Sequence, residues 1–260
     1  LGAWLVAWQN SYQHEAVHGH PTPWRWLNDG LAGAPLGLWM PYADYRETHL
    51  RHHDADLTVP GDDPESFYRD VSAWNGLAPV VRTLLVFNNT YLGRLTIGPA
   101  LTMVQYWHGA AGRLAAGEGV AIRMWLGHIL GVAVVLGWVM AVCDIPVLAY
   151  VFLFAYPGLS LTLTRSYLEH RPAADPDHRT VIVESGPVAS LLYLNNNLHA
   201  AHHRWPGMSW YRLPAAFAAH RGDLLSGNGG YRYSGYREVA GRHLVRAKDI
   251  PVHPGVGSAI

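Results

Sequence analysis

Two long apolar stretches lie in the middle of the chain. Residues 124–143 contain no charged residue, with the weakly polar His128 as their exception, and Asp144 follows. Residues 145–164 form a second uncharged stretch, which Arg165 closes. Because a helix needs about 20 apolar residues to cross a bilayer, the pattern predicts two transmembrane helices joined by a tight turn around Asp144. A buried hairpin in a soluble core is disfavoured, since soluble helices rarely stay apolar on every face over such a length.

The charges around this hairpin predict its orientation. A single acid marks the turn, whereas basic residues flank the open ends, namely Arg113, Arg123, Arg165 and Arg171. Positive charges stay on the cytoplasmic side of a membrane, so the open ends are predicted to face the cytoplasm. We expect one all-α integral membrane helical bundle over residues 1–260, with a cytoplasmic His-rich helical cap. The near-absence of lysine beside abundant Arg, Ala and Gly suggests a bacterial source and hence the inner membrane.

Other apolar segments are less regular. Residues 1–8 look like the end of an earlier span, so we expect an N-terminal span that is truncated here. Residues 31–42 are too short to cross a membrane, and residues 80–107 are interrupted by polar side chains. Both are predicted to form helices that lie at the membrane interface or re-enter it. Residues 206–260 are rich in Arg, Gly and Tyr and are predicted to form a cytoplasmic C-terminal region.

The composition excludes several classes of function. The 260 residues carry 19 Lys and Arg against 19 Asp and Glu, so the chain lacks the basic surplus that nucleic-acid binding requires. The single cysteine, Cys143, excludes a disulfide framework, a Cys-based zinc finger and an iron–sulfur site. The 11 Trp and 14 Tyr suit a membrane interface, and the 16 His suggest that the protein binds a metal ion.

Many of the histidines fall into three tight groups. Their spacings are i, i+3 and i+4, which share one face of a helix. Neutral imidazole is the commonest protein ligand for transition metals, and eight imidazoles exceed one tetrahedral site and fit two metal ions. His20 lies off the face of the first group and is not expected to be a ligand. The predicted ligands are His14 and His18, then His49, His52 and His53, then His199, His202 and His203.

These groups, HEAVH, HLRHH and HAAHH, resemble the histidine boxes of the membrane fatty acid desaturase and hydroxylase superfamily, and specifically its bacterial acyl-lipid-desaturase-like branch. A predicted hairpin separates the second box from the third, as in that family. The resemblance also implies an isolated ligand, His170, and a pair of iron ions. Acyl-CoA desaturases carry an Asn one turn earlier, where this chain has Ser166. Asn195 or Asn196 is an alternative outer ligand, or a cap of the third-box helix.

The resemblance implies that the ligands are the only catalytic groups and that further residues support them. Metal-bound imidazoles usually donate their second N–H to a carboxylate or carbonyl. The candidates for this supporting role are Glu15, Asp54, Glu169 and Asn196, although each acid is equally well explained as a solvated surface residue.

The resemblance further implies an O2-dependent oxidoreductase that introduces a double bond into an unactivated C–C bond, most simply of a fatty-acyl chain. A hydroxylase on the same scaffold and a desaturase of a small amino-acid-like substrate remain open. Redox-silent zinc cannot support this reaction, although purified protein can carry it. No GxGxxG or P-loop pattern is present, so an external ferredoxin, rubredoxin or cytochrome with its reductase is expected.

Two alternatives of another class are a membrane haem protein and a metal transporter or sensor. Haem ligation would need His deep within facing spans, where only His128 lies. Transport would need polar residues through the membrane, which residues 124–164 almost entirely lack.

Overall fold

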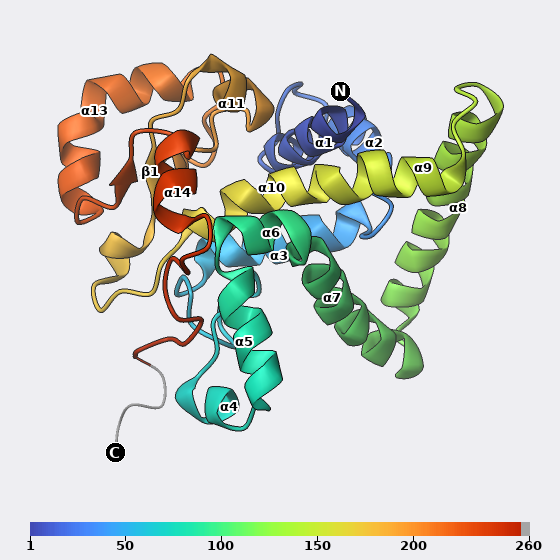
Figure 1. Ribbon diagram of the computed structural model, residues 1–260. Helices are drawn as coiled ribbons and strands as arrows, with labels where there is room; N and C mark the ends of the chain where they lie inside the picture. The colour runs from blue at the N-terminus through green and yellow to red at the C-terminus, as the bar shows by residue number, and fades with distance from the viewer. Residues whose placement is uncertain (256–260) are drawn as a thin grey trace. The chain divides into compact units, whose positions relative to one another are not determined.

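The computed structural model describes residues 1–255 and is built almost entirely of helices (Figure 1). The predicted fold class, an all-α helical membrane bundle, is confirmed. Contacts divide the chain into two compact units. Unit 1 comprises Leu1–Glu47 and Leu95–Leu163, and unit 2 comprises Thr48–Arg94 and Thr164–Ile260.

Unit 1 contains the long apolar helices. The elements that begin in it are α1 (Gly2–Val17), α2 (Arg25–Ala32), α3 (Tyr42–Asp54), α7 (Gly98–Ala115), α8 (Gly119–Ala141), α9 (Val147–Tyr150), a π-helical turn (Val151–Ala155) and α10 (Tyr156–Glu169).

Unit 2 consists of shorter elements. Its helices are α4 (Val71–Asn75), α5 (Pro79–Asn88), α6 (Tyr91–Thr96), a 3-10 turn (Pro176–Arg179), α11 (Pro187–Leu192), α12 (His199–Arg204), α13 (Leu213–Gly227) and α14 (Tyr236–His243). Two short parallel strands accompany them, β1 (Ile182–Val183) and β2 (Arg232–Tyr233).

Two helical runs are long and apolar enough to cross a membrane: α8, and the run Val147–Glu169 that joins α9, the π-helical turn and α10. Both extend past the predicted apolar stretches at their open ends, so Arg123 and Arg165 fall inside helices. Arginine is a good helix former, which explains why the helices continue through these charges. Asp144, with φ of 52°, makes the turn between the two runs.

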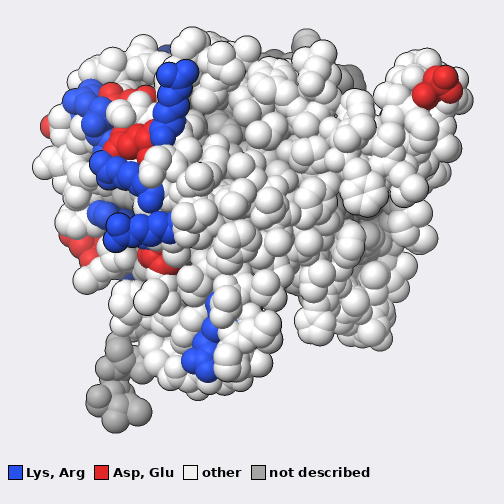
Figure 2. All heavy atoms as spheres, in the orientation of Figure 1, with Lys and Arg blue, Asp and Glu red and all other residues white. Residues whose placement is uncertain are grey.

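The surface of α8 is apolar on most sides. Leu126, Leu130 and Val134 each expose about two thirds of their area, and the face drawn in Figure 2 is free of charge over α7 and α8 except at the α8–α9 turn. A helix with so many exposed large apolar side chains would be unstable in water, and it fits a lipid surround.

The prediction of a helix through residues 31–42 is wrong. α2 ends at Ala32, and residues 33–41 form an irregular loop that contains two prolines. Proline removes a backbone donor and disfavours helix in the residue before it. Polar side chains of the apolar helices contact main-chain carbonyls of this loop. Gln9 donates to the carbonyl of Ala34, and His128 Nε2 lies 3.0 Å from the carbonyl oxygen of Leu38.

α1 lies against the start of α10 at a glycine. A Cβ atom added to Gly158 would lie 2.6 Å from Val6 Cβ, closer than such atoms approach in proteins. Small residues let helix backbones come close together in membranes, so Gly158 allows this pair of helices to pack.

The end of α10 passes into a short extended segment of unit 2. His170 pairs with Thr180 as an antiparallel bridge, and the flanking bonds run from Arg171 N to Arg179 O and from Val181 N to Glu169 O. His170 therefore occupies the non-hydrogen-bonded position of the bridge, and its own carbonyl points away from the partner strand.

Candidate metal centre

Seven of the nine predicted ligands lie in unit 2. α3 carries His49, His52 and His53, α12 carries His199, His202 and His203, and His170 follows the last residue of α10. The two helices present their histidines at the i, i+3 and i+4 spacing that the sequence predicted.

The first box lies in unit 1. His14 is on the last turn of α1, and His18 is the residue that ends this helix. Their ring centroids are 5.0 Å apart, so the two imidazoles form one neighbouring pair. His14 is buried, and His18 is partly buried.

Four of the rings in unit 2 converge on one point, and we call them the four-histidine group: His52, His170, His199 and His203. His170 Nε2 lies 3.0 Å from His52 Nε2 and 3.1 Å from His199 Nε2. His203 Nε2 lies 3.1 Å from His199 Nε2. Each ring offers one ligand nitrogen, and the four nitrogens lie within 4.8 Å of one another.

These separations fit a shared metal ion. Metal–nitrogen bonds of about 2.0–2.1 Å place neighbouring ligand nitrogens about 3.0–3.4 Å apart, depending on the coordination angle. His170 Nε2 faces two other Nε2 atoms, and His199 Nε2 does the same. A neutral ring has only one N–H, so such a cluster of converging lone pairs is best satisfied by a cation.

The other three rings of unit 2 form the three-histidine group: His49, His53 and His202. His202 Nε2 lies 3.1 Å from His53 Nε2, and the ring centroids of His49 and His53 are 4.9 Å apart. The two groups are neighbours within unit 2, because the rings of His53 and His203 stack with centroids 4.4 Å apart.

Side-chain oxygen atoms contact Nδ1 of two rings and so keep the Nε2 atoms of these rings directed at the other imidazoles. His52 Nδ1 lies 2.8 Å from Asp63 Oδ1, and both side chains are almost fully buried. His49 Nδ1 lies 3.0 Å from Glu65 Oε1. A carboxylate on Nδ1 fixes the ring in the tautomer whose Nε2 lone pair is free for a metal.

Asn196 and Glu169, two of the predicted supporting residues, lie beside His199. Asn196 Oδ1 is 2.9 Å from His199 Nδ1, and Glu169 Oε1 is 3.4 Å from the same atom. Asn196 also donates to Glu169 Oε1 at 3.3 Å. The residue that caps α12 is Leu198, so neither Asn195 nor Asn196 caps that helix.

The remaining supporting candidates have other surroundings. Glu15 is buried in unit 1, with Oε1 3.8 Å from His14 Nδ1. Asp54 is exposed at the end of α3. Sequence reasoning missed Asp63 and Glu65, the acids that contact the second box. They lie in the loop after α3, and their one signal in the sequence is the acidic run around Pro64.

Most rings in the two groups are held neutral. Burial lowers the pKa of His53 to about 3. Burial likewise holds the pKa values of His170, His199 and His203 well below the ordinary range, and neighbouring imidazoles add to this effect. Neutral imidazole is the form that binds metal, so these rings need to lose no proton at pH 7.

His52 differs from its neighbours. Burial disfavours its charged form, but the carboxylates of Glu65 and Asp63 outweigh this effect and raise its pKa to about 9. Without metal, His52 is therefore protonated at pH 7, and a metal ion entering the four-histidine group must displace that proton.

Comparison with known proteins agrees with this centre. The sequence pattern of the family described as fatty acid desaturase matches residues 1–235. The chain belongs to the fatty acid desaturase family. A search among curated proteins returns no match. The family match spans all three boxes and His170, and it identifies this desaturase-family protein as an oxidoreductase of membranes.

The donor set of unit 2 fits the paired iron ions for which this family is known. All seven donors are imidazoles, and imidazole binds iron, zinc, copper and nickel. The spacing of the ligand nitrogens fits a metal, and the family indicates iron.

Proposed function

We propose that this protein is an O2-dependent di-iron desaturase that introduces a double bond into a fatty-acyl chain. The observation that carries the proposal is the convergence of four Nε2 atoms in unit 2, with successive separations of 3.0 and 3.1 Å. The membership of the chain in the fatty acid desaturase family supports the reaction type.

The four-histidine group would hold one iron ion, and the three-histidine group would contribute to the second. We propose that His14 and His18 supply the remaining ligands of the second ion, as the first box does in the family that the sequence resembles. The neutral state of His53, His170, His199 and His203 supports metal binding by the two groups of unit 2, because binding then requires few protons to leave.

The bound irons would supply the oxidising power that cleaves an unactivated C–H bond, which no side chain of this chain can do alone. In the overall reaction two hydrogens leave adjacent carbons of the substrate, O2 is reduced to two waters, and an external one-electron carrier supplies two electrons with two protons. Asp63 and Glu65 hold His52 and His49 in place, while Asn196 and Glu169 do the same for His199.

An apolar substrate is supported by the surface of the protein. The exposed side chains of α8 indicate that unit 1 lies in lipid, where fatty-acyl chains are abundant. We propose that the protein resides in a bacterial inner membrane with the histidines on the cytoplasmic side, where a ferredoxin, rubredoxin or cytochrome can deliver electrons. The excess of arginines at the open ends of the hairpin supports this orientation.

The test combines metal analysis with product analysis. Protein in lipid nanodiscs should contain about two irons per chain, with Mössbauer parameters of a coupled pair, and should convert a fatty-acyl substrate in the presence of O2 and a reducing system. A product that has lost two hydrogens identifies a desaturase, whereas a product that has gained one oxygen identifies a hydroxylase. Folded protein that binds no metal would refute the proposal.

A matched pair of variants locates the reaction. His199 lies in the four-histidine group, whereas His220 is exposed on α13 and makes none of these contacts. We expect His199→Ala to lose metal and activity, and His220→Ala to retain both. Equal activity of the two variants would show that the site lies elsewhere.

A further inference from the structure

Lys248 is the only lysine of the chain, and it lies beyond the residues that match the family. Its side chain is 4% exposed. Burial lowers the pKa of its ammonium group to about 8, a shift that the carboxylate of Asp249 opposes. A buried ammonium is costly unless it is hydrogen-bonded, so its partners indicate what the group does.

The ammonium group is directed at a predicted metal ligand. Lys248 Nζ donates to the main-chain carbonyl of His170 at 2.5 Å and to the hydroxyl oxygen of Tyr68 at 3.2 Å. The Tyr68 hydroxyl also lies 3.3 Å from the His170 carbonyl oxygen, and it donates to Asp249 Oδ2 at 2.8 Å. The carbonyl is open to these donors because His170 occupies the non-hydrogen-bonded position of its bridge with Thr180.

The ring of His170 lacks the oxygen partner on Nδ1 that three other predicted ligands have. His49, His52 and His199 each have an oxygen atom within 3.0 Å of Nδ1. The Nδ1 atom of His170 is buried, and within residues 1–255 it has no hydrogen-bond partner. The position of this ring therefore depends on its main chain and on the rings packed around it.

The segment that contains Lys248 is fixed by hydrogen bonds at several points along its length. We call residues 244–253 the C-terminal clasp. Leu92 N donates to Leu244 O at 2.9 Å, Lys248 N donates to Asn89 O at 2.8 Å, and Asn89 Nδ2 donates to Asp249 O at 2.7 Å. At the far end, His253 N donates to Arg69 O at 2.8 Å.

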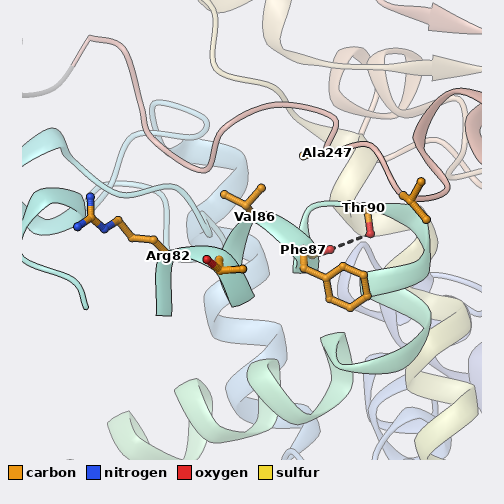
Figure 3. Close-up of a pocket in the computed structure, with 7 residues that line it drawn as sticks. Arg82, Val86, Phe87, Thr90 and Ala247 are labelled. Carbon is orange, nitrogen blue, oxygen red and sulfur yellow. Dashed lines mark hydrogen bonds between the residues drawn. The ribbon is translucent and has the colours of Figure 1, made fainter. Parts of the chain in front are cut away.

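The clasp also lies beside α5, with an open groove of about 380 Å³ between them (Figure 3). The groove is mainly apolar, and the hydroxyl of Thr90 in its lining donates to the carbonyl of Phe87 at 2.8 Å. Its lining includes Val86 and Phe87 of α5 and Val245 and Ala247 of the clasp. The hydrogen bonds between the clasp and Asn89 therefore help to hold the main chain at Lys248 in position beside this groove.

We propose that Lys248 is a positioning residue that fixes the main chain of His170 and thereby aims its Nε2 atom into the four-histidine group. This inference rests on the proposed function, since it assigns His170 to a metal. The C-terminal clasp is then part of the metal centre, although its residues are no ligands.

The experiment compares Lys248→Met with Arg246→Met, a matched change at an exposed position of the same clasp. Outer residues that orient ligands typically contribute about 10–100-fold to metal affinity. We expect Lys248→Met to release metal to a chelator about 10–100-fold faster than the wild type, and to retain close to one metal per chain where the wild type retains two. Arg246→Met should match the wild type, and Lys248→Arg should recover part of the loss.

Thermal unfolding of the metal-free proteins separates positioning from general stability. Positioning predicts that metal release changes far more than the melting temperature of the metal-free form. Should Lys248→Met fail to fold, Tyr68→Phe removes the hydroxyl that accepts from Lys248 Nζ and lies 3.3 Å from the same carbonyl, and it decides the question by the same release assay. If folded Lys248→Met released metal at the same rate as the wild type, the role of Lys248 would be overturned but the proposed function would stand. If the wild-type protein itself bound no metal, the proposed function would be overturned as well.

Discussion

Protonation of His52 predicts a measurable proton release when metal binds. The pKa of about 9 leaves this ring about 0.9 protonated at pH 8, whereas a ring with the ordinary value near 6.5 is about 0.03 protonated there. A metal ion that enters the four-histidine group should therefore release close to one proton from His52 at pH 8. The competition weakens metal binding at that pH by about tenfold, or roughly 1.4 kcal/mol.

Asp63→Asn tests this reasoning, because Asp63 lies 2.8 Å from His52 Nδ1 and raises its pKa. Binding of Zn²⁺, measured by calorimetry in two buffers of different ionisation enthalpy, gives the number of protons released. We expect fewer protons from Asp63→Asn than from the wild type at pH 8. Metal affinity above pH 9, where proton competition ends, should also fall, by about 10–100-fold.

Asp54→Asn is the matched control. Asp54 follows the second box directly, but its side chain is exposed, so this change should leave both proton release and affinity as in the wild type. Equal proton release at pH 8 by Asp63→Asn and the wild type would refute the protonated His52. A loss of affinity in Asp54→Asn alone would show that the supporting acid was misassigned.

Three further predictions concern stability. Gly158→Ala should lower the free energy of unfolding by about 1–3 kcal/mol, because its Cβ would overlap α1; Gly127→Ala, with open space around the Cβ, is the control in a thermal denaturation series. Metal-free protein should lose stability in urea as pH falls from about 6.5 toward 3, because in this range the unfolded chain protonates His53 while the folded protein keeps it neutral; a flat profile would contradict this. Gln9→Leu should cost about 0.5–1.5 kcal/mol by removing the bonds that Gln9 Nε2 donates to the carbonyls of Ala32 and Ala34, which keep Gln13 Nε2 and Leu36 N as donors, and chemical denaturation in detergent would detect this.

The sequence predicted the structure best where the relevant residues are close together in the chain, as in the histidine groups and the apolar runs. The spacing of His49, His52 and His53 is local, and a helix turns such a spacing into one face, as α3 does. The apolar runs also depend only on neighbouring residues, so the presence of two long apolar helices could be predicted. Their ends could not, because residues such as Arg123 continue a helix without contributing to the apolar signal.

The supporting residues depend on tertiary contacts and were therefore harder to predict. Asp54 was chosen because it is adjacent in sequence, but Asp63, 11 positions from His52, makes the hydrogen bond. Lys248 is separated by 78 positions from His170, and no local pattern links them. Loop 33–41 was predicted as helix because its composition is apolar, and the prolines within it decide its actual conformation.

The all-imidazole donor set has a consequence for redox chemistry. Neutral ligands transfer no formal negative charge to a metal pair, so two ferrous ions would bring four uncompensated positive charges into unit 2. The nearest counter-charges to the second box, Asp63 and Glu65, lie one ring farther out, on the Nδ1 side of His52 and His49. Such a centre stabilises the reduced state more than a centre with directly bound carboxylates would. Substitutions in the loop after α3 would therefore shift the reduction potential of such a centre without altering a single metal ligand.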